Sequence, residues 1–282
     1  MNSSPEINRL AVCSWSLLPE DPGDLAEKLT STGVQRVQLA LDPLRESPSV
    51  WGDAESVLEQ AGITIISGMF GCVGEDYSTL DSIRQSGGIC PDTTWEQNLA
   101  NISATVPIAV SLGLKLVTFH AGFVPHDPAD PDYAKMLTRL AAVSEIFRNE
   151  GIAVGLETGQ ETAEELASLM EVLNDSNVFI NFDPANMLLY GKGDPIQALR
   201  LLAPWIRQVH IKDAVTSRVP GEWGEEVPVG TGEVNWHDFF SMLEEANYTG
   251  DLVIEREAGN QRLIDIRSAR ELVLKYIFKS QN

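Results

Sequence analysis

The sequence predicts a closed barrel of eight parallel β-strands with helices between them, the (β/α)₈ fold, and three observations support this. Eight short β-rich segments are spread along the 282 residues, and a helix-like segment follows each of them. Strict alternation of strands and helices is typical of a parallel sheet, and eight such units suit a sheet that closes on itself. No G-x-G-x-x-G motif follows the first strand, which disfavours the structural alternative, a doubly wound open sheet.

The predicted strands are about four to six residues long and mostly apolar, as expected when both faces of a sheet are buried. A glycine stands between the helix-like segment and the strand in STGVQ, QAGIT, SLGLK, NEGIA and YTGDL. Because glycine adopts the left-handed conformation easily, we expect these glycines to end the helices. The predicted strands are Leu10–Ser14, Arg36–Leu39, Thr64–Gly68, Leu116–Phe119, Ala153–Leu156, Val178–Phe182, Gln208–Ile211 and Asp251–Ile254.

The composition, 43% hydrophobic and 22% charged residues, is ordinary for a soluble globular protein. No apolar run approaches the roughly 20 residues needed to span a bilayer. The N-terminal MNSSPEINRL lacks the basic and then apolar regions of a secretory signal. Cys13, Cys72 and Cys90 are too few for a disulfide framework or a cysteine zinc site. Since no linker or composition shift is present, we predict a single domain over residues 1–282, located in the cytoplasm.

The charge balance bears on the partners that the protein can bind. Twenty basic residues face 41 acidic ones, which gives a formal net charge of −21, and no run of Lys or Arg interrupts this. Such a surface repels phosphate backbones and anionic lipids. We therefore expect neither nucleic acid nor membrane as a partner.

Three connections are longer than a barrel requires, and all of them leave the C-terminal ends of predicted strands. They are Gly71–Asp92, Gly122–Asp132 and Asp213–Asn235. Long loops in compact domains are usually functional, and in a (β/α)₈ barrel this face carries the active site. The first connection contains four glycines (Gly71, Gly74, Gly87 and Gly88), and we expect it to open and close as a lid.

Four consecutive strands end in residues that bind divalent metals. These are Glu157 in GLETG, Asp183 in NFDPAN, His210 in QVHIKD and Glu255 in LVIERE. Three neighbouring carboxylates would repel one another unless a positive charge lay between them. One imidazole with carboxylates suits Mn²⁺, Co²⁺, Zn²⁺ or Mg²⁺.

Each of these residues also has a structural alternative when taken alone. Asp183 before Pro184 is ordinary chemistry for a turn or a helix cap. Glu157 is consistent with a solvated loop residue, and His210 with a hydrogen-bonded core histidine. Glu255, followed by Arg256 and Glu257, is consistent with a surface ion-pair cluster. Their coincidence at four successive strand ends favours the metal site.

These segments resemble the xylose-isomerase-like TIM-barrel superfamily, which includes sugar and sugar-phosphate isomerases and epimerases. The resemblance covers essentially the whole chain, and its most specific segments are GLET, NFDPAN, VHIKD, VPVGTGEVNW and VIERE. It implies that one divalent metal ion is bound by Glu157, Asp183, His210 and Glu255. A metal ligand must be held in a fixed position. The resemblance therefore implies a reason why the rigid residue Pro184 follows Asp183.

The resemblance also implies an activity, the isomerisation or epimerisation of a ketose or related sugar, free or phosphorylated. Glu157 and Glu255 are then the catalytic pair that moves a proton through a metal-bound enediolate. Four further residues are candidates for substrate binding, with a structural role beside the site as the alternative. They are His120, Lys212, Arg256 and Asn186.

Three alternatives to this activity are DNA repair, a lyase reaction and sugar binding without catalysis. DNA repair is disfavoured, because Asn186 replaces a His of the endonuclease members and the chain has only four histidines: His120, His126, His210 and His237. A lyase that removes water from a keto-sugar or inosose remains the alternative, since the same metal and base suit elimination. A barrel that binds sugar without catalysis is a third. Exposed barrel helices often pair, so we expect a homo-oligomer, a dimer or a tetramer.

Overall fold

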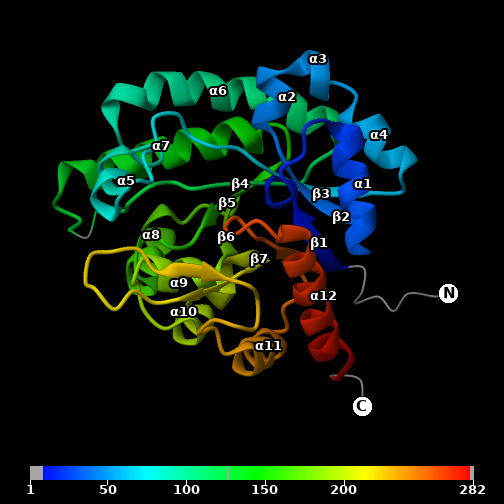
Figure 1. The fold of residues 1–282 in the computed structure, drawn as a ribbon. Helices are drawn as coiled ribbons and strands as arrows, with labels where there is room; N and C mark the ends of the chain where they lie inside the picture. Colours follow the sequence, from blue (N-terminus) through cyan, green and yellow to red (C-terminus); the bar gives the residue numbers. More distant parts are fainter. Residues whose placement is uncertain (1–8, 126, 280–282) are drawn as a thin grey trace.

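The computed structural model describes residues 9–125 and 127–279, and its strands close into one parallel barrel (Figure 1). Around the barrel the strands run β1-β10-β7-β6-β5-β4-β3-β2, and every neighbouring pair is parallel. The predicted fold class is confirmed, and no predicted strand boundary is wrong by more than two residues. The barrel strands are β1 Leu10–Cys13, β2 Arg36–Ala40, β3 Thr64–Met69, β4 Leu116–Phe119, β5 Ala153–Glu157, β6 Val178–Phe182, β7 Ile206–Ile211 and β10 Asp251–Ile254.

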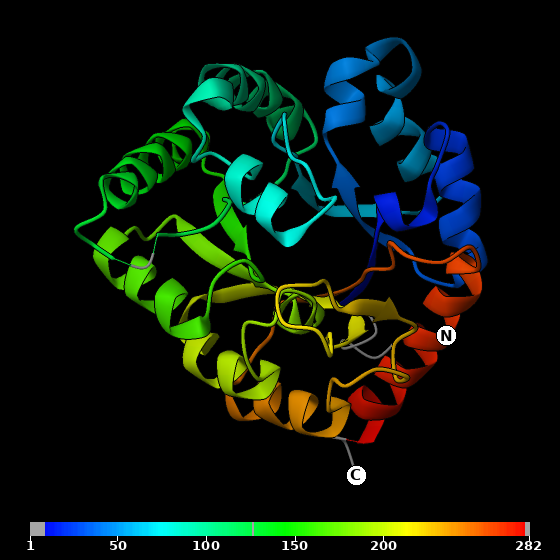
Figure 2. The same cartoon turned by 60° about the vertical axis from the view of Figure 1, so that its left-hand side comes forward.

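Helices surround the barrel as a ring, which Figure 2 shows nearly along the barrel axis. The strands lie between a buried interior and these helices. Short 3-10 helices occupy Ser14–Leu17 and Ala203–Trp205. The α-helices are α1 Pro22–Thr32, α2 Asp42–Glu46, α3 Pro48–Trp51, α4 Ala54–Gln60, α5 Leu80–Ser86, α6 Asp92–Ser111, α7 Pro131–Arg148, α8 Ala163–Leu173, α9 Pro184–Leu189, α10 Pro195–Leu202, α11 Trp236–Glu245 and α12 Arg262–Lys279.

Four of the five predicted glycines have the left-handed conformation that ends a helix. Gly33, with φ +74°, closes α1 through a hydrogen bond from its N–H to the Thr30 carbonyl, and Gly62, Gly113 and Gly151 also have positive φ. The expectation for Gly250 is wrong. Asn247, with φ +52°, takes the left-handed position after α11. Gly250 is required for close packing instead, since a Cβ there would lie 2.4 Å from the Arg207 carbonyl oxygen.

The core between strands and helices is aromatic and aliphatic. The rings of Phe70 and Phe119 stack with centroids 4.8 Å apart, and Phe147 of α7 stacks on Phe70 at 5.8 Å. β4 and β5 are buried at every position. Interiors packed this densely have low compressibility, so the C-terminal ends of the strands form a rigid frame for side chains.

The long connections predicted from the sequence carry short elements of their own. α5 lies within residues 71–92, and the connection after β7 forms an antiparallel pair, β8 Asp213–Val215 and β9 Glu225–Val227. Both lie over one end of the barrel in Figure 2. A further insertion that the sequence analysis missed, α2 and α3, follows β2.

Asp213 explains how the motif VPVGTGEVNW is fixed to the barrel. Its carboxylate accepts hydrogen bonds from the backbone N–H groups of Gly230 (2.8 Å), Gly232 (3.1 Å) and Val234 (3.2 Å), and from Trp236 Nε1 (3.0 Å). A buried carboxylate with this many donors is well satisfied. The loop after β9 is therefore held in one conformation.

Part of what the sequence predicts concerns residues that the structure does not describe. Residues 1–8, which carry most of the segment used to exclude a secretory signal, lie outside the described residues, as does His126. Within the described part of the chain, no helix is both long and apolar enough to cross a membrane. The single-domain organisation stays a prediction.

Candidate metal centre

The four predicted ligands come together at the C-terminal ends of β5, β6, β7 and β10. One ligand atom from each of Glu157, Asp183, His210 and Glu255 lies within 4.8 Å of the others. His210 Nδ1 is 3.4 Å from Glu157 Oε1, 3.3 Å from Glu255 Oε2 and 3.8 Å from Asp183 Oδ2. All four side chains are buried.

Several atoms of this cluster are buried without a hydrogen-bond partner among the described residues. They include Asp183 Oδ2 and His210 Nδ1. Glu255 Oε2 also makes no well-aligned hydrogen bond, although Lys212 Nζ lies 2.9 Å away. Buried polar atoms without partners are costly and rare. Because these atoms converge on one point, and because carboxylates with one imidazole are good ligands for a divalent cation, the residues fit a metal ion.

The geometry of Asp183 is compatible with both roles that the sequence left open. Its Oδ1 caps α9 by accepting from the N–H groups of Ala185 (2.7 Å) and Asn186 (3.1 Å). Its Oδ2 is the free atom in the cluster. Thr158 Oγ1 accepts from the Asp183 N–H at 2.8 Å. The helix cap therefore orients the carboxylate, and its second oxygen faces the other ligands.

His210 is oriented by polar residues inside the barrel. Its Nε2 lies 2.8 Å from Gln38 Oε1, an atom that only accepts hydrogen bonds. The Asn181 side-chain amide lies 3.0 Å from the same nitrogen, so Nε2 faces the polar interior of the barrel and Nδ1 is the ring nitrogen that faces the carboxylates. Gln38 is itself held by Thr118 Oγ1 at 2.7 Å. Such partners behind a ligand fix its tautomer and raise its basicity.

The two glutamates are held from different sides. Glu157 Oε1 accepts from Asn186 Nδ2 at 3.0 Å, and His120 Nε2 lies 3.6 Å from the same atom. Glu255 Oε1 accepts from Trp15 Nε1 at 2.7 Å. Trp15 was missed in the sequence because it lies in the 3-10 helix after β1, far along the chain from the predicted ligands.

The carboxylates differ in their electrostatic surroundings. Burial alone would raise the pKa of Glu255, but Lys212 and His210 hold that pKa well below its usual range. Burial likewise opposes ionisation of Glu157, yet His120 and His210 lower its pKa. The pKa of Asp183 is raised by burial, which Lys212 only partly offsets. Both glutamates are therefore ionised at neutral pH.

A cavity of about 420 Å³ opens beside the cluster. Three of the predicted substrate-binding residues, His120, Lys212 and Asn186, line it. Most of the other lining groups come from the loops and were not predicted. They include Trp15, Glu75, Tyr77, Tyr190, Trp223, Glu226 and Glu257.

Arg256 is the predicted substrate-binding residue that the structure does not bring into this cavity. Its guanidinium binds Glu226 Oε1 at 2.8 Å and Asp265 Oδ2 at 2.9 Å. Successive side chains along a strand point to opposite faces, so Arg256 points away where Glu255 points inward. Arg256 therefore matches the alternative considered for it, a structural ion pair beside the site.

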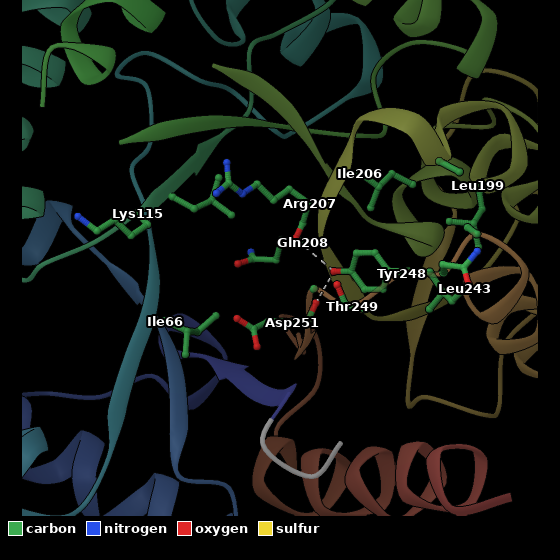
Figure 3. Close-up of a pocket in the computed structure, with 15 residues that line it drawn as sticks. Ile66, Lys115, Leu199, Ile206, Arg207, Gln208, Leu243, Tyr248, Thr249 and Asp251 are labelled. Atoms are coloured by element: carbon green, nitrogen blue, oxygen red, sulfur yellow. Dashed lines mark hydrogen bonds between the residues drawn. The ribbon is translucent and has the colours of Figure 1, made fainter. Parts of the chain in front are cut away.

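A second cavity, of about 440 Å³, lies at the opposite end of the barrel. It is lined by the N-terminal parts of the strands, including Ile66, Arg207 and Asp251, as Figure 3 shows. Tyr248 closes one side by donating to the Asp251 carbonyl oxygen at 2.7 Å. Since all four candidate ligands lie at the other end, this cavity is remote from the metal centre.

The connection that we expect to act as a lid borders the cavity. Glu75 and Tyr77 of this connection line the cavity, and the Gly88 N–H donates to Glu75 Oε1 at 2.9 Å. Gly88 has φ +68°, and a Cβ there would lie 2.0 Å from the Ala121 carbonyl oxygen. Gly88 therefore lets the backbone of this connection pack against the backbone at Ala121. If the connection opens, this contact must break or move with it.

Residues 71–92 should exchange their amide hydrogens more slowly when a ligand fills the cavity, because Glu75 and Tyr77 then gain contacts. Hydrogen exchange with mass spectrometry, with and without a saturating substrate analogue, measures this. Peptides from α12, on the outside of the barrel, serve as the internal control. Equal exchange of residues 71–92 in both states would make this connection a surface insertion without a gating role.

A buried acid near the centre gives a prediction for stability. Burial raises the pKa of Glu161 to about 8, with Lys192 and His120 opposing that rise. The folded pKa lies above the unfolded one of about 4.3, so the protonated form favours the fold. That contribution is complete below pH ~4.3 and is lost as pH rises to about 8, with a slope of up to ~1.4 kcal/mol per pH unit.

Glu161→Gln should therefore flatten the decrease in the free energy of unfolding between pH 5 and 8, a window set by that same shift. Urea unfolding in the presence of a chelator, measured at each pH for both proteins, tests this. Parallel pH profiles would show that Glu161 titrates normally in the folded protein.

A buried cluster of three carboxylates and one imidazole thus lies at the C-terminal rim of a (β/α)₈ barrel. Residues 26–276 match the model of the xylose isomerase-like TIM barrel family. The chain belongs to this family. The resemblance seen in the sequence is thereby confirmed.

Individual relatives agree with this placement. The crystal structure of a xylose isomerase domain protein from Planctomyces limnophilus is 33% identical, with a TM-score of 0.87 over 96% of this chain and 98% of that one. An inosose dehydratase from Clostridium botulinum (strain Eklund 17B / Type B) is 32% identical over 112 residues, which is 36% of this chain and only 37% of the dehydratase. An L-ribulose 3-epimerase structure, at 16% identity and a TM-score of 0.74 over 97% of this chain and 95% of that one, shares the fold.

Proposed function

We propose that this protein is a divalent-metal-dependent isomerase or epimerase of a ketose or related sugar. The observation that carries the proposal is the convergence of buried atoms without partners, Asp183 Oδ2 and His210 Nδ1, beside two ionised glutamates. When bound, a divalent cation supplies positive charge that offsets the carboxylates and polarises a substrate carbonyl. Glu157, Asp183, His210 and Glu255 are the residues that would hold it.

The chain's own residues supply the proton transfer. One of Glu157 and Glu255 removes a proton from the carbon beside the substrate carbonyl. The other returns it on the opposite face of that carbon (epimerisation) or on the neighbouring carbon (isomerisation). Trp15 fixes Glu255, and Asn186 fixes Glu157, by the hydrogen bonds described above. A positioned base needs such fixed geometry to act efficiently.

The charges around the cavity bear on the kind of sugar. Five acidic residues line it: Asp42, Glu75, Glu226, Glu255 and Glu257. The cationic candidates there are His120 and Lys212, and Lys212 already pairs with Glu255 at 2.9 Å and Glu257 at 2.6 Å. His120 Nε2 lies 3.6 Å from Glu157, so a phosphate would meet a field in which the acidic groups outnumber the cationic ones. The substrate is therefore an unphosphorylated polyhydroxy compound.

Deuterium incorporation during a substrate screen tests the proposed function. Ketoses and keto-sugars are incubated with the Mn²⁺-loaded protein in D₂O, and products are analysed by NMR. The cognate substrate should gain one deuterium at the reacting carbon as the epimer or isomer forms. Product that forms without deuterium would contradict proton exchange at the glutamates, and no reaction across the panel would contradict the substrate class.

A dehydratase is the second candidate, favoured by the 32% identity to inosose dehydratase. The same glutamate would remove the proton, and a hydroxyl on the next carbon would leave as water instead of a proton being returned. The D₂O experiment separates the two, because dehydration yields a product lighter than the substrate by one water.

A further inference from the structure

A small apolar cavity adjoins the candidate active site. It has a volume of about 220 Å³ and is lined by Ser14, Trp15, Leu18, Pro19, Ala40, Pro43 and Trp51. No ionisable side chain is among these residues. Ser14, the polar member, already accepts a hydrogen bond from the Ala40 N–H at 2.9 Å through its hydroxyl. The lining thus offers an apolar surface with no free polar side chain.

Two residues connect this cavity to the main one. Trp15 and Ala40 line both. Trp15 also donates to Glu255 Oε1 at 2.7 Å, so its indole lies between the candidate catalytic carboxylate and the apolar cavity. A molecule that contacts Glu255 and reaches past Trp15 would enter this second space.

Leu18 is held in an unusual way at the edge of the cavity. Its φ is +48°, in the left-handed region, which residues other than Gly, Asn and Asp rarely adopt. Its side chain is 63% exposed, the largest exposure among the large apolar residues that the structure describes. The Leu18 N–H ends the 3-10 helix by donating to the Trp15 carbonyl at 3.2 Å, but the apolar side chain that this backbone presents to solvent gains little burial in the free protein. Backbone strain of this kind is often found at functional sites.

The cavity floor comes from an insertion that the barrel does not require. Trp51 is the last residue of α3 and is only 6% exposed, and Pro43 belongs to α2. An apolar cavity of about 150 Å³ is known to hold one benzene molecule. The 220 Å³ available here is therefore enough for a single six-membered ring.

We propose that this cavity is a subsite for an apolar ring attached to the substrate, so that the substrate is a sugar with an apolar or aromatic substituent. The main cavity is rich in carboxylates and suits hydroxyl groups, whereas the adjoining one suits only apolar atoms. A ligand that fills both is amphipathic. This inference rests on the proposed function in one respect, that the sugar occupies the main cavity.

Binding of p-fluorophenol, measured by fluorine NMR on the full chain without metal, tests the subsite independently of any turnover. We expect saturable binding at one site. Leu18→Asn keeps a residue that tolerates the left-handed conformation, and it should weaken binding at least about tenfold, the typical effect of removing one apolar side chain from a pocket. The same variant should raise the melting temperature, because it relieves strain.

Val172→Asn is the matched control, since Val172 on α8 is 56% exposed and lines neither cavity. Its p-fluorophenol binding should equal that of the wild type.

Phenyl β-D-glucoside should displace p-fluorophenol at lower concentration than methyl β-D-glucoside. Absent saturable binding, equal binding by Leu18→Asn, or equal displacement by the two glucosides would overturn the proposal. So would a lower molar mass of Leu18→Asn in light scattering, because Leu18 would then contact a second copy of the chain. A failed D₂O screen leaves these fragment results unaffected, so the two proposals fail separately.

Discussion

Glu255→Gln should lower kcat by roughly 10²–10⁴-fold, the usual contribution of a positioned acid or base. The amide keeps the size of the side chain and can still contact Trp15, but it cannot accept the proton. Substrate affinity should change little, because an interaction made only in the transition state is lost from kcat. Steady-state kinetics on the substrate identified in D₂O, with metal content measured in each preparation, gives the comparison.

Glu157→Gln should behave in the same way, and one of the two variants is expected to exchange deuterium into the substrate without forming product. That variant retains the glutamate facing the first proton removed. Glu164→Gln, an exposed residue in the first turn of α8, controls for the amide substitution itself. Near-normal turnover in both metal-replete glutamate variants would mean that another group, such as Lys212 or His120, moves the proton.

Removal of the metal should have an effect of similar size. A divalent ion stabilises developing charge by several kcal/mol, so chelation should reduce turnover by about 10³-fold or more, and Mn²⁺ should restore it.

Asp183→Asn separates metal binding from folding. Asparagine caps helices nearly as well as aspartate, so α9 should persist and the melting temperature without metal should change little.

Affinity of Asp183→Asn for Mn²⁺ should nevertheless fall by at least about 100-fold, because residues behind the ligands already account for 10–100-fold. Isothermal titration of the wild type and the variant measures this. Equal affinities would show that Asp183 does not bind the metal. Turnover that survives chelation would show that the reaction does not need the metal.

The fold and the four metal-binding candidates could be predicted from the sequence for one physical reason. The C-terminal ends of parallel strands in a closed barrel meet at one rim. Residues that end consecutive strands, such as Asp183 and His210, must therefore lie close together. The period of two along a strand extends this rule, since Lys212 lies two residues after His210 and lines the cavity, whereas Asp213 points to the loop that it holds.

The same rule explains the error at Arg256, which follows Glu255 directly and faces Glu226 and Asp265 instead. The rest of the site could not be predicted, because loops contribute it. Trp15 and Tyr77 reach the cavity only through tertiary contacts of segments with no periodic pattern. Trp51 belongs to an insertion whose position depends on packing against β2 and its neighbours. These residues determine the shape of the site, and hence its substrate.

Anomalous scattering from a crystal of the Mn²⁺-loaded protein tests the central claim most directly. We expect one strong anomalous peak at the C-terminal rim, within about 2.0–2.6 Å of ligand atoms from Glu157, Asp183, His210 and Glu255. His210 should bind through Nδ1, since Nε2 faces Gln38. A peak elsewhere, or no peak at saturating Mn²⁺, would contradict the metal centre and with it the proposed function.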